Sequence, residues 1–158
     1  MKLLILSDAH SNIFALDAIL RAEADADAIL CAGDLTDHGY GSSQSIFDFD
    51  RFIGEKPTDA RDFPTRLILG HSHRQTVCHF RGDRLFLTPG SISYRRSDDP
   101  DKTAHYALIL DGEIVLKALS YDLIPLQDEV RRLQAEGRMS EKEPEYGAFF
   151  FGLASSVG

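Results

Sequence analysis

Residues 3–34 read LLILSDAHSNIFALDAILRAEADADAILCAGD, and this stretch decides the fold. Its opening apolar run, 3–6, predicts a strand that is buried on both faces and ends at Ser7-Asp8. From Asn12 onward, apolar residues recur at helical spacing, with Asn12 as the expected N-cap. A second apolar run, 28–32, predicts another buried strand. Strand, helix and strand in this order indicate a right-handed βαβ unit with a parallel sheet.

The rest of the chain predicts shorter elements around that unit. A third apolar strand is expected at 66–69. Two hairpins follow, one from strands 77–80 and 85–87 around Arg81-Gly82-Asp83, and one from strands 104–110 and 113–119 around Asp111-Gly112. Antiparallel hairpins after a parallel unit indicate an α/β domain with a mixed sheet or two sheets.

Three further segments complete the predicted single domain, residues 1–158. Residues 123–135 show the helical spacing of a surface helix. The segment 35–65 is harder to interpret, with a loop expected at 39–43 and a short helix at 46–53. A C-terminal extension, about 137–158, has no assigned structure and either packs on the core or contacts a partner.

The acidic charge of the chain limits the kinds of partner that it is expected to bind. The net charge of −8 and the pI near 5.1 argue against a protein that grips duplex nucleic acid over a broad basic face. A small anionic substrate is compatible with this negative charge, because bound divalent cations can reverse the local electrostatic field. No stretch is apolar and long enough for a signal peptide or a membrane helix, so we expect a cytoplasmic protein without membrane contact. Cys31 and Cys78 are expected to be reduced, buried thiols.

Acidic and histidine side chains follow each of the three predicted strands. They are Asp8 and His10, then Asp34, then His71 and His73. Residues i and i+2 of an extended chain point the same way, so each two-residue pair should converge. Each cluster alone is more often structural, but all three lie beyond carboxyl ends of strands, where open α/β sheets place ligands. Together they predict a metal site for manganese, iron, nickel or zinc.

Hydrolysis of a phosphate ester is a reaction that needs such a ligand set. Two cations that share one carboxylate can acidify a water molecule between them and hold phosphoryl oxygens. Asp34 is the natural bridging ligand and in that sense the catalytic residue. The sequence therefore predicts hydrolysis of a phosphate ester by a metal-bound hydroxide at a binuclear site.

The motifs Ser7-Asp8-Ala9-His10-Ser11-Asn12, Gly33-Asp34 and Gly70-His71-Ser72-His73 resemble those of the calcineurin-like metallophosphoesterase family. Pro89-Gly90-Ser91 and the Asp-Gly hairpin followed by Tyr121-Asp122 resemble its small bacterial phosphodiesterase branch. The resemblance implies a sandwich of two mixed β-sheets flanked by helices. It also implies that Asp8, His10 and His73 hold a first metal, that Asp34 bridges, and that His71 holds a second.

One family motif has no match. The family places a Gly-Asn-His type motif between the second and third motifs, and its Asn binds the second metal. This chain has a single asparagine, Asn12, which belongs to the first motif. His38-Gly39 either closes the loop after Asp34 or supplies a displaced second-metal ligand.

Two explanations for the missing motif stay open. Either the protein has lost an interior segment, or the sequence joins two stretches that another segment separates in the natural chain. We favour the second, because loss of interior strands should damage a two-sheet core. A distance well above 3.8 Å between the Cα atoms of two consecutive residues, at any point between residues 34 and 47, would establish it.

We thus predict a metal-dependent phosphoric ester hydrolase that acts on a small phosphate ester or nucleotide, most plausibly a phosphodiester. It would use two divalent ions, manganese before iron, nickel or zinc. Asn12 and Arg74 are candidate substrate-binding residues, although a solvated arginine is the more ordinary interpretation of Arg74. The alternative is a catalytically weakened scaffold or binding protein, as some family members are assembly subunits. A homo-oligomer is compatible with either reading.

Overall fold

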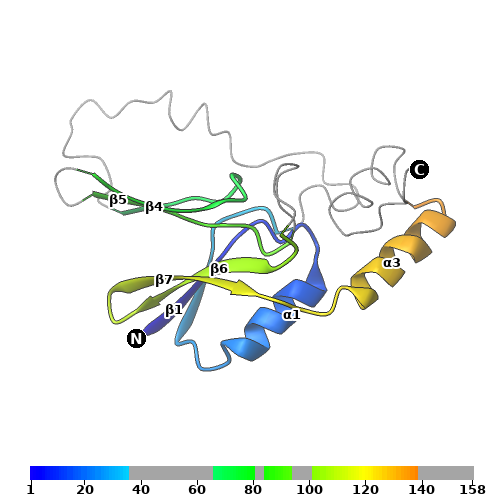
Figure 1. Ribbon diagram of the computed structural model, residues 1–158, viewed down its shortest axis with the longest axis horizontal. Coiled ribbons are helices and arrows are strands. Elements are labelled where there is room, and N and C mark those ends of the chain that lie inside the picture. The colour runs from blue at the N-terminus through cyan, green and yellow to red at the C-terminus, as the bar shows by residue number, and fades with distance from the viewer. Residues whose placement is uncertain (36–65, 81–83, 94–100, 139–158) are drawn as a thin grey trace.

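Two β-sheets dominate the computed structural model, which describes residues 1–35, 66–80, 84–93 and 101–138 (Figure 1). The elements, in chain order, are β1 (Lys2–Leu6), α1 (Ile13–Ala22), β2 (Ala28–Cys31), β3 (Arg66–Ile68), β4 (Gln75–Phe80), β5 (Arg84–Pro89), β6 (Ala104–Leu110), β7 (Glu113–Leu119) and α3 (Ile124–Ala135). Their order confirms the α/β class and every strand that the sequence predicts within the described residues.

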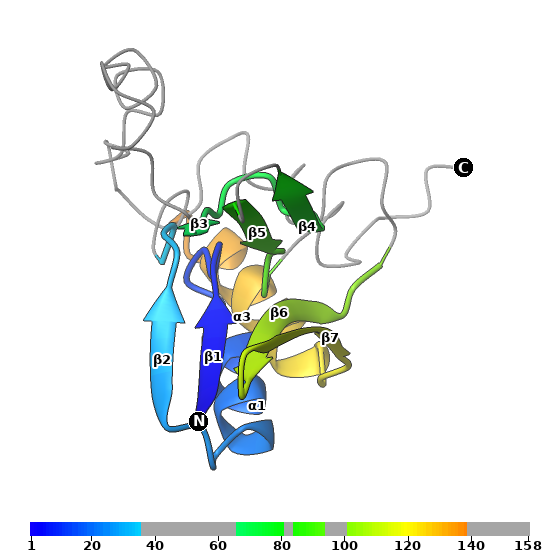
Figure 2. The same cartoon turned by 90° about the vertical axis from the view of Figure 1, so that its left-hand side faces the viewer.

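Each sheet is mixed. The first has the order β2-β1-β6-β7, with β1 parallel to β2 and antiparallel to β6 (Figure 2). The second has the order β3-β5-β4, with β5 parallel to β3 and antiparallel to β4. The predicted sandwich of two mixed sheets flanked by helices is therefore confirmed, and the third strand lies in a different sheet from the first two.

The alternation of side chains along β1 explains why its run is apolar throughout. Ile5 faces the second sheet and packs with Leu87 and Ala107 between the two sheets. Leu4 and Leu6 face the opposite way, toward Ile19 of α1 and its neighbours. Figure 1 shows the same layering, with β4 and β5 on one side of the first sheet and α1 on the other.

The predicted turns and caps are confirmed where the structure describes them. The Asn12 side chain accepts a hydrogen bond from the Ala15 amide, 3.1 Å, and so caps α1. Leu110 pairs with Glu113, which leaves a two-residue turn at Asp111-Gly112. Both turn residues have positive φ, 49° and 95°, as a type I′ hairpin requires. Helix α3 buries one stripe, Leu126, Val130 and Leu133, and is the surface helix that was expected.

The prediction of a buried second strand is wrong. β2 is an edge strand, and Ile29 within it is 55% exposed. For the same reason the prediction of buried thiols fails, because Cys31 is exposed and Cys78 is half-buried, although both are free. An apolar run indicates a strand but not whether a neighbour pairs with both of its edges.

Several predictions fall on residues that the structure does not describe. They are the loop at 39–43 with His38, the helix at 46–53, the chain spacing between residues 34 and 47, the turn 81–83 and the extension beyond residue 138. Across the described ranges, we find no helix with the length and apolarity needed to span a membrane.

A buried carboxylate joins α1 to the first sheet. Glu23, directly after α1, accepts hydrogen bonds from Lys2 Nζ at 2.8 Å and from the Tyr106 hydroxyl. Burial acts to raise the pKa of Glu23, but these hydrogen bonds outweigh it and hold the pKa below its ordinary value of 4.5. Folding therefore favours the ionised form, and this contribution to stability is lost as the pH falls through the lowered pKa.

Replacing Tyr106 with Phe should lower the free energy of unfolding by about 1.5–3 kcal/mol at pH 7, because it removes a hydrogen bond to a buried charge. The difference between wild type and Tyr106→Phe should shrink once Glu23 is protonated. Urea unfolding at neutral pH and at a pH below the lowered pKa of Glu23 measures both effects. An equal difference at the two pH values would contradict this account.

Candidate metal centre

The loops that follow β1 and β2 run side by side beyond the ends of these strands. The amides of Asp8 and His10 donate to the carbonyls of Gly33, 3.1 Å, and Asp34, 3.0 Å. The Ser11 amide donates to the Leu35 carbonyl at 2.9 Å. Backbone pairing thus continues past both strands and brings the first two sequence motifs together.

Left-handed backbone is concentrated in these loops. Among the described residues, seven that are not glycine have positive φ, and six of them belong to the three motifs. The six are Asp8, His10, Ser11, Asp34, His71 and His73, and the seventh is Asp111 in its hairpin turn. Asp and His adopt this region more readily than most residues, yet each still costs about 1–2 kcal/mol. Such a cluster of strained residues is typical of functional sites.

The predicted convergence holds for Asp8 and His10, whose ligand atoms lie 3.9 Å apart, but the reason given for it is wrong. It does not hold for His71 and His73, because the His71 side chain is 87% exposed and lies outside the buried group that contains His73. Asp8 and His10 do not lie in extended chain, since β1 ends at Leu6 and both residues have left-handed φ, 53° and 46°. His71 and His73 follow the same pattern, at 67° and 57°. The side chains are therefore aimed by tight loops and not by the alternation of a strand.

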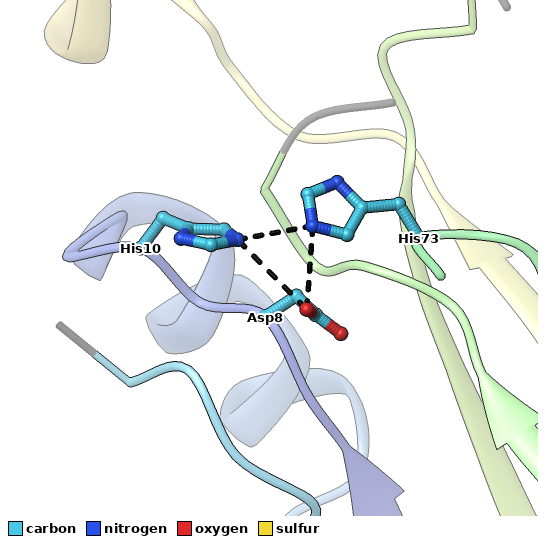
Figure 3. Close-up of side chains that lie close together, drawn as sticks. All are labelled: Asp8, His10 and His73. Carbon is cyan, nitrogen blue, oxygen red and sulfur yellow. Dashed lines mark hydrogen bonds and ion pairs between the residues drawn. The ribbon is translucent and has the colours of Figure 1, made fainter. Parts of the chain in front are cut away.

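Asp8, His10 and His73 form one compact, buried group (Figure 3). The two Nε2 atoms of the histidines lie 3.2 Å apart. Asp8 Oδ1 lies 3.3 Å from Nε2 of His73 and 3.9 Å from Nε2 of His10. Two atoms that bind one ion at about 2.1 Å lie about 3.0 Å apart at a right angle and about 3.4 Å apart at a tetrahedral angle. Two of the three distances, 3.2 and 3.3 Å, fall in this range, and 3.9 Å corresponds to a wider angle of about 136° at the same bond length. The three ligand atoms therefore fit a single divalent ion.

The Asp8 carboxylate is held from two sides. Its Oδ2 accepts hydrogen bonds from the Ser7 hydroxyl at 2.5 Å and from the His71 amide at 3.0 Å, and the same amide lies 2.8 Å from Oδ1. Burial acts to raise the pKa of Asp8, but hydrogen bonds from His73, Ser7 and the His71 amide lower it overall. The carboxylate is thus ionised at neutral pH, as a metal ligand must be.

Gly70 permits the close approach of the third loop. A Cβ atom at this position would lie 2.8 Å from the Ala32 carbonyl oxygen and 2.9 Å from Asp8 Oδ2. Neither atom can move freely, because one is backbone and the other is held by hydrogen bonds. The glycine of the predicted Gly-His-Ser-His motif is therefore required by space at the site.

Asp34 and His71 lie at the rim and outside the compact group. Asp34 Oδ2 is 3.9 Å from Nδ1 of His71. The His71 side chain is 87% exposed and that of Asp34 is 24% exposed. Among the described residues, Asp8, His10 and His73 are the one group of three side chains whose ligand atoms all lie within 4.8 Å of one another. Of the residues that the resemblance assigns to a second metal, the described ones therefore form a two-residue pair.

The remaining candidates have varied positions. Asn12 is buried, and its amide nitrogen donates to the Tyr121 hydroxyl, 2.9 Å, and to Ser93, 3.3 Å. Arg74 is exposed directly after His73, and the proposed ligand His38 lies outside the described residues. His105 Nε2 lies 2.9 Å from Asp101 Oδ2. The substrate-binding roles of Asn12 and Arg74 stay predictions.

Sequence reasoning missed the part that Gly90–Ser93 plays at the site. These residues follow β5 of the second sheet and contact the loop that contains Asp8. The Ser91 hydroxyl donates to the Asp8 carbonyl at 2.9 Å, and the Ile92 amide donates to the Ser7 carbonyl at 3.2 Å. The sequence shows the Pro89-Gly90-Ser91 motif, but a contact between residues 83 positions apart leaves no periodic signal.

The fold and the site together define an α/β sandwich with a candidate divalent-metal centre at the ends of its strands. The sequence pattern of the calcineurin-like phosphoesterase family matches residues 1–90. The chain belongs to this family. No curated protein matches the sequence significantly.

Solved structures share the same fold at low identity. A metallophosphoesterase from Sphaerobacter thermophilus matches with a TM-score of 0.59 and 16% identity, over 90% of this chain and 96% of that one. A novel archaeal phosphodiesterase matches with a TM-score of 0.52 and 14% identity, over 75% of this chain and all of the other. A conserved protein of Streptococcus pneumoniae, a predicted phosphoesterase, has a TM-score of 0.50 and 16% identity, over 75% and 88%. These likenesses establish the fold.

Replacing Gly70 with Ala should weaken both the fold and metal binding, because the added methyl group must displace the Ala32 carbonyl or the Asp8 carboxylate. We expect a lower midpoint of thermal unfolding and a smaller rise of that midpoint when Mn²⁺ is added. Differential scanning calorimetry with and without Mn²⁺ measures both. Full retention of the metal-induced rise would show that the close approach is dispensable.

The left-handed backbone at His71 makes a second prediction. Because φ is 67° there, His71→Gly should have a free energy of unfolding about 1 kcal/mol higher than His71→Ala in metal-free protein. His79, exposed within β4, provides the matched control, since glycine should be the less stable replacement in a strand. Urea unfolding of the glycine and alanine variants at positions 71 and 79 measures the four free energies of unfolding. The same order of glycine and alanine at both positions would contradict the prediction.

Proposed function

We propose that this protein is a metal-dependent phosphoric ester hydrolase that acts on a small phosphate ester or nucleotide, with a phosphodiester as the preferred class. One observation carries the proposal: a buried carboxylate and two imidazoles present ligand atoms 3.2–3.9 Å apart in a chain of the calcineurin-like phosphoesterase family. Without a metal, burying a carboxylate beside two imidazoles would cost desolvation free energy that apolar side chains of similar size would not.

The proposed centre holds two divalent ions, with manganese first among the candidates. Asp8, His10 and His73 would bind the first, His71 the second, and Asp34 would lie between them. His38 remains a candidate for the second position. Divalent ions there would supply an acidified water and would offset the negative charge of the phosphate.

The residues of the chain would provide orientation. The hydrogen bonds to Asp8 Oδ2 turn Oδ1 toward the two histidine rings, so one carboxylate oxygen faces the ion. The exposed position of His71 and Arg74 beside the buried group supports access for an anionic substrate from that side. Arg74 would then contact a phosphate oxygen.

Elemental analysis combined with an activity screen tests the proposal. We expect about two transition-metal ions per chain. We also expect hydrolysis of bis(p-nitrophenyl) phosphate to exceed that of p-nitrophenyl phosphate. Asp34→Asn should abolish metal-dependent hydrolysis, whereas His79→Ala, a change of an exposed histidine on β4, should leave it intact. Undiminished activity in Asp34→Asn would end this mechanism.

The second candidate function is a scaffold that kept the fold and lost efficient catalysis. The observation that favours it is that Asp34, half-buried, and His71, exposed, belong to no group of three metal-binding side chains among the described residues. Metal content separates the two functions. Purified protein that takes up no divalent ion would favour the scaffold.

A further inference from the structure

We propose that Ser7 and Ser91 are positioning residues that together fix Asp8 for metal binding, Ser7 through the carboxylate and Ser91 through the backbone. The inference rests on the proposed function to the extent that Asp8 is taken as a metal ligand. It assigns a role in the site to two hydroxyl groups that would not themselves touch the ion or the substrate.

The Ser7 hydroxyl determines which carboxylate oxygen of Asp8 is presented. Its Oγ lies 2.5 Å from Asp8 Oδ2 and 2.9 Å from the Gly90 carbonyl oxygen. A serine carries one hydroxyl hydrogen, so it donates to one acceptor at a time. The shorter distance and the negative charge assign the hydrogen to Asp8. With Oδ2 engaged in this way, Oδ1 is the oxygen that faces the two histidine rings.

The Ser91 hydroxyl holds the backbone of the same residue. It donates to the Asp8 carbonyl at 2.9 Å and accepts from the Ser93 amide at 3.0 Å. The Ser91 carbonyl in turn accepts from the His105 amide of β6 at 2.9 Å. Asp8 has a φ of 53°, a conformation that persists only when surrounding contacts enforce it. Ser91 connects that strained residue to the first sheet.

Both serines are fully buried, so water cannot replace the hydrogen bonds that they make. Without Ser7, the His71 amide alone would hold Oδ2, and the carboxylate could rotate away from the histidine rings. Without Ser91, the Asp8 carbonyl would lose a buried donor and the left-handed turn would relax. Either change would make the ion reorganise its ligands on binding, which lowers affinity.

Ser93 provides a matched control in the same segment, Gly90–Ser93. It is buried like Ser91, and its Oγ accepts from Asn12 Nδ2 at 3.3 Å. Replacing it with alanine removes the same atom from the same segment, two residues further along. A general loss of packing would affect Ser91→Ala and Ser93→Ala alike, whereas a positioning role would separate them.

The test is titration of Mn²⁺ into the EDTA-treated 158-residue chain, followed by isothermal calorimetry, after circular dichroism has shown that each variant is folded. Ser7→Ala and Ser91→Ala should each weaken the tightest Mn²⁺ step by about 10–100-fold, and Ser93→Ala by much less. Because the two variants act on Asp8 through different atoms, either one that folds is sufficient for the comparison.

The outcomes separate this inference from the proposed function. Tight Mn²⁺ binding by wild type with equal affinity in Ser7→Ala and Ser91→Ala would overturn the inference and leave the metal site intact. Equal weakening in Ser93→Ala would also overturn it. Binding that follows the expected order without any phosphodiester hydrolysis would support the inference while the proposed function failed. No Mn²⁺ binding by wild type would overturn both.

Discussion

The buried charge of Asp8 is the constraint on which the rest of this structure depends. A carboxylate that is 1% exposed is costly to bury unless hydrogen-bond donors surround it. Here the donors come from separate parts of the chain: the Ser7 hydroxyl at the end of β1, and the His71 amide in the loop after β3. The hydrogen bond from the His71 amide thereby joins the third motif to the first. Loops from both sheets meet at this carboxylate, and the candidate ligand group forms there.

Backbone strain and ligand geometry are two aspects of the same arrangement. Left-handed residues reverse the chain sharply, which lets three short loops crowd their side chains into a space suited to one ion. This conformation is unfavourable at each position, so neighbouring contacts must enforce it. The backbone pairs between the first two loops, the bare Cα of Gly70 and the Ser91 hydroxyl supply those contacts. Sequence propensity is overruled in these loops, as is expected where structure serves a site.

Patterns with a local physical cause could be predicted from the sequence. Apolar runs indicated the strands, Asp111-Gly112 indicated the tight hairpin, and Asn12 indicated the start of α1. The grouping of Asp8, His10 and His73 followed from motif resemblance, since no local rule places residues 63 positions apart in contact. Properties that depend on distant neighbours could not be predicted. The edge position of β2, the exposure of Cys31 and the contact of Ser91 with Asp8 belong to that class.

Asn12, the single asparagine of the chain, makes structural contacts with both polar groups of its side chain. Its carbonyl oxygen caps α1, and its amide nitrogen donates to Tyr121 and Ser93, so both polar groups of the side chain serve the fold. Moving either toward a metal would uncap the helix or break a buried contact between α1 and the segment before α3. The single asparagine is thus engaged in structural contacts, and its substrate-binding role stays a prediction.

The two metal positions that we propose differ in kind. The ligand atoms of the first are buried and aligned by contacts from both sheets, whereas the described residues of the second, half-buried Asp34 and exposed His71, lie at the rim. An ion in the first position would find its ligands in place; one in the second would have to order an exposed imidazole as it bound.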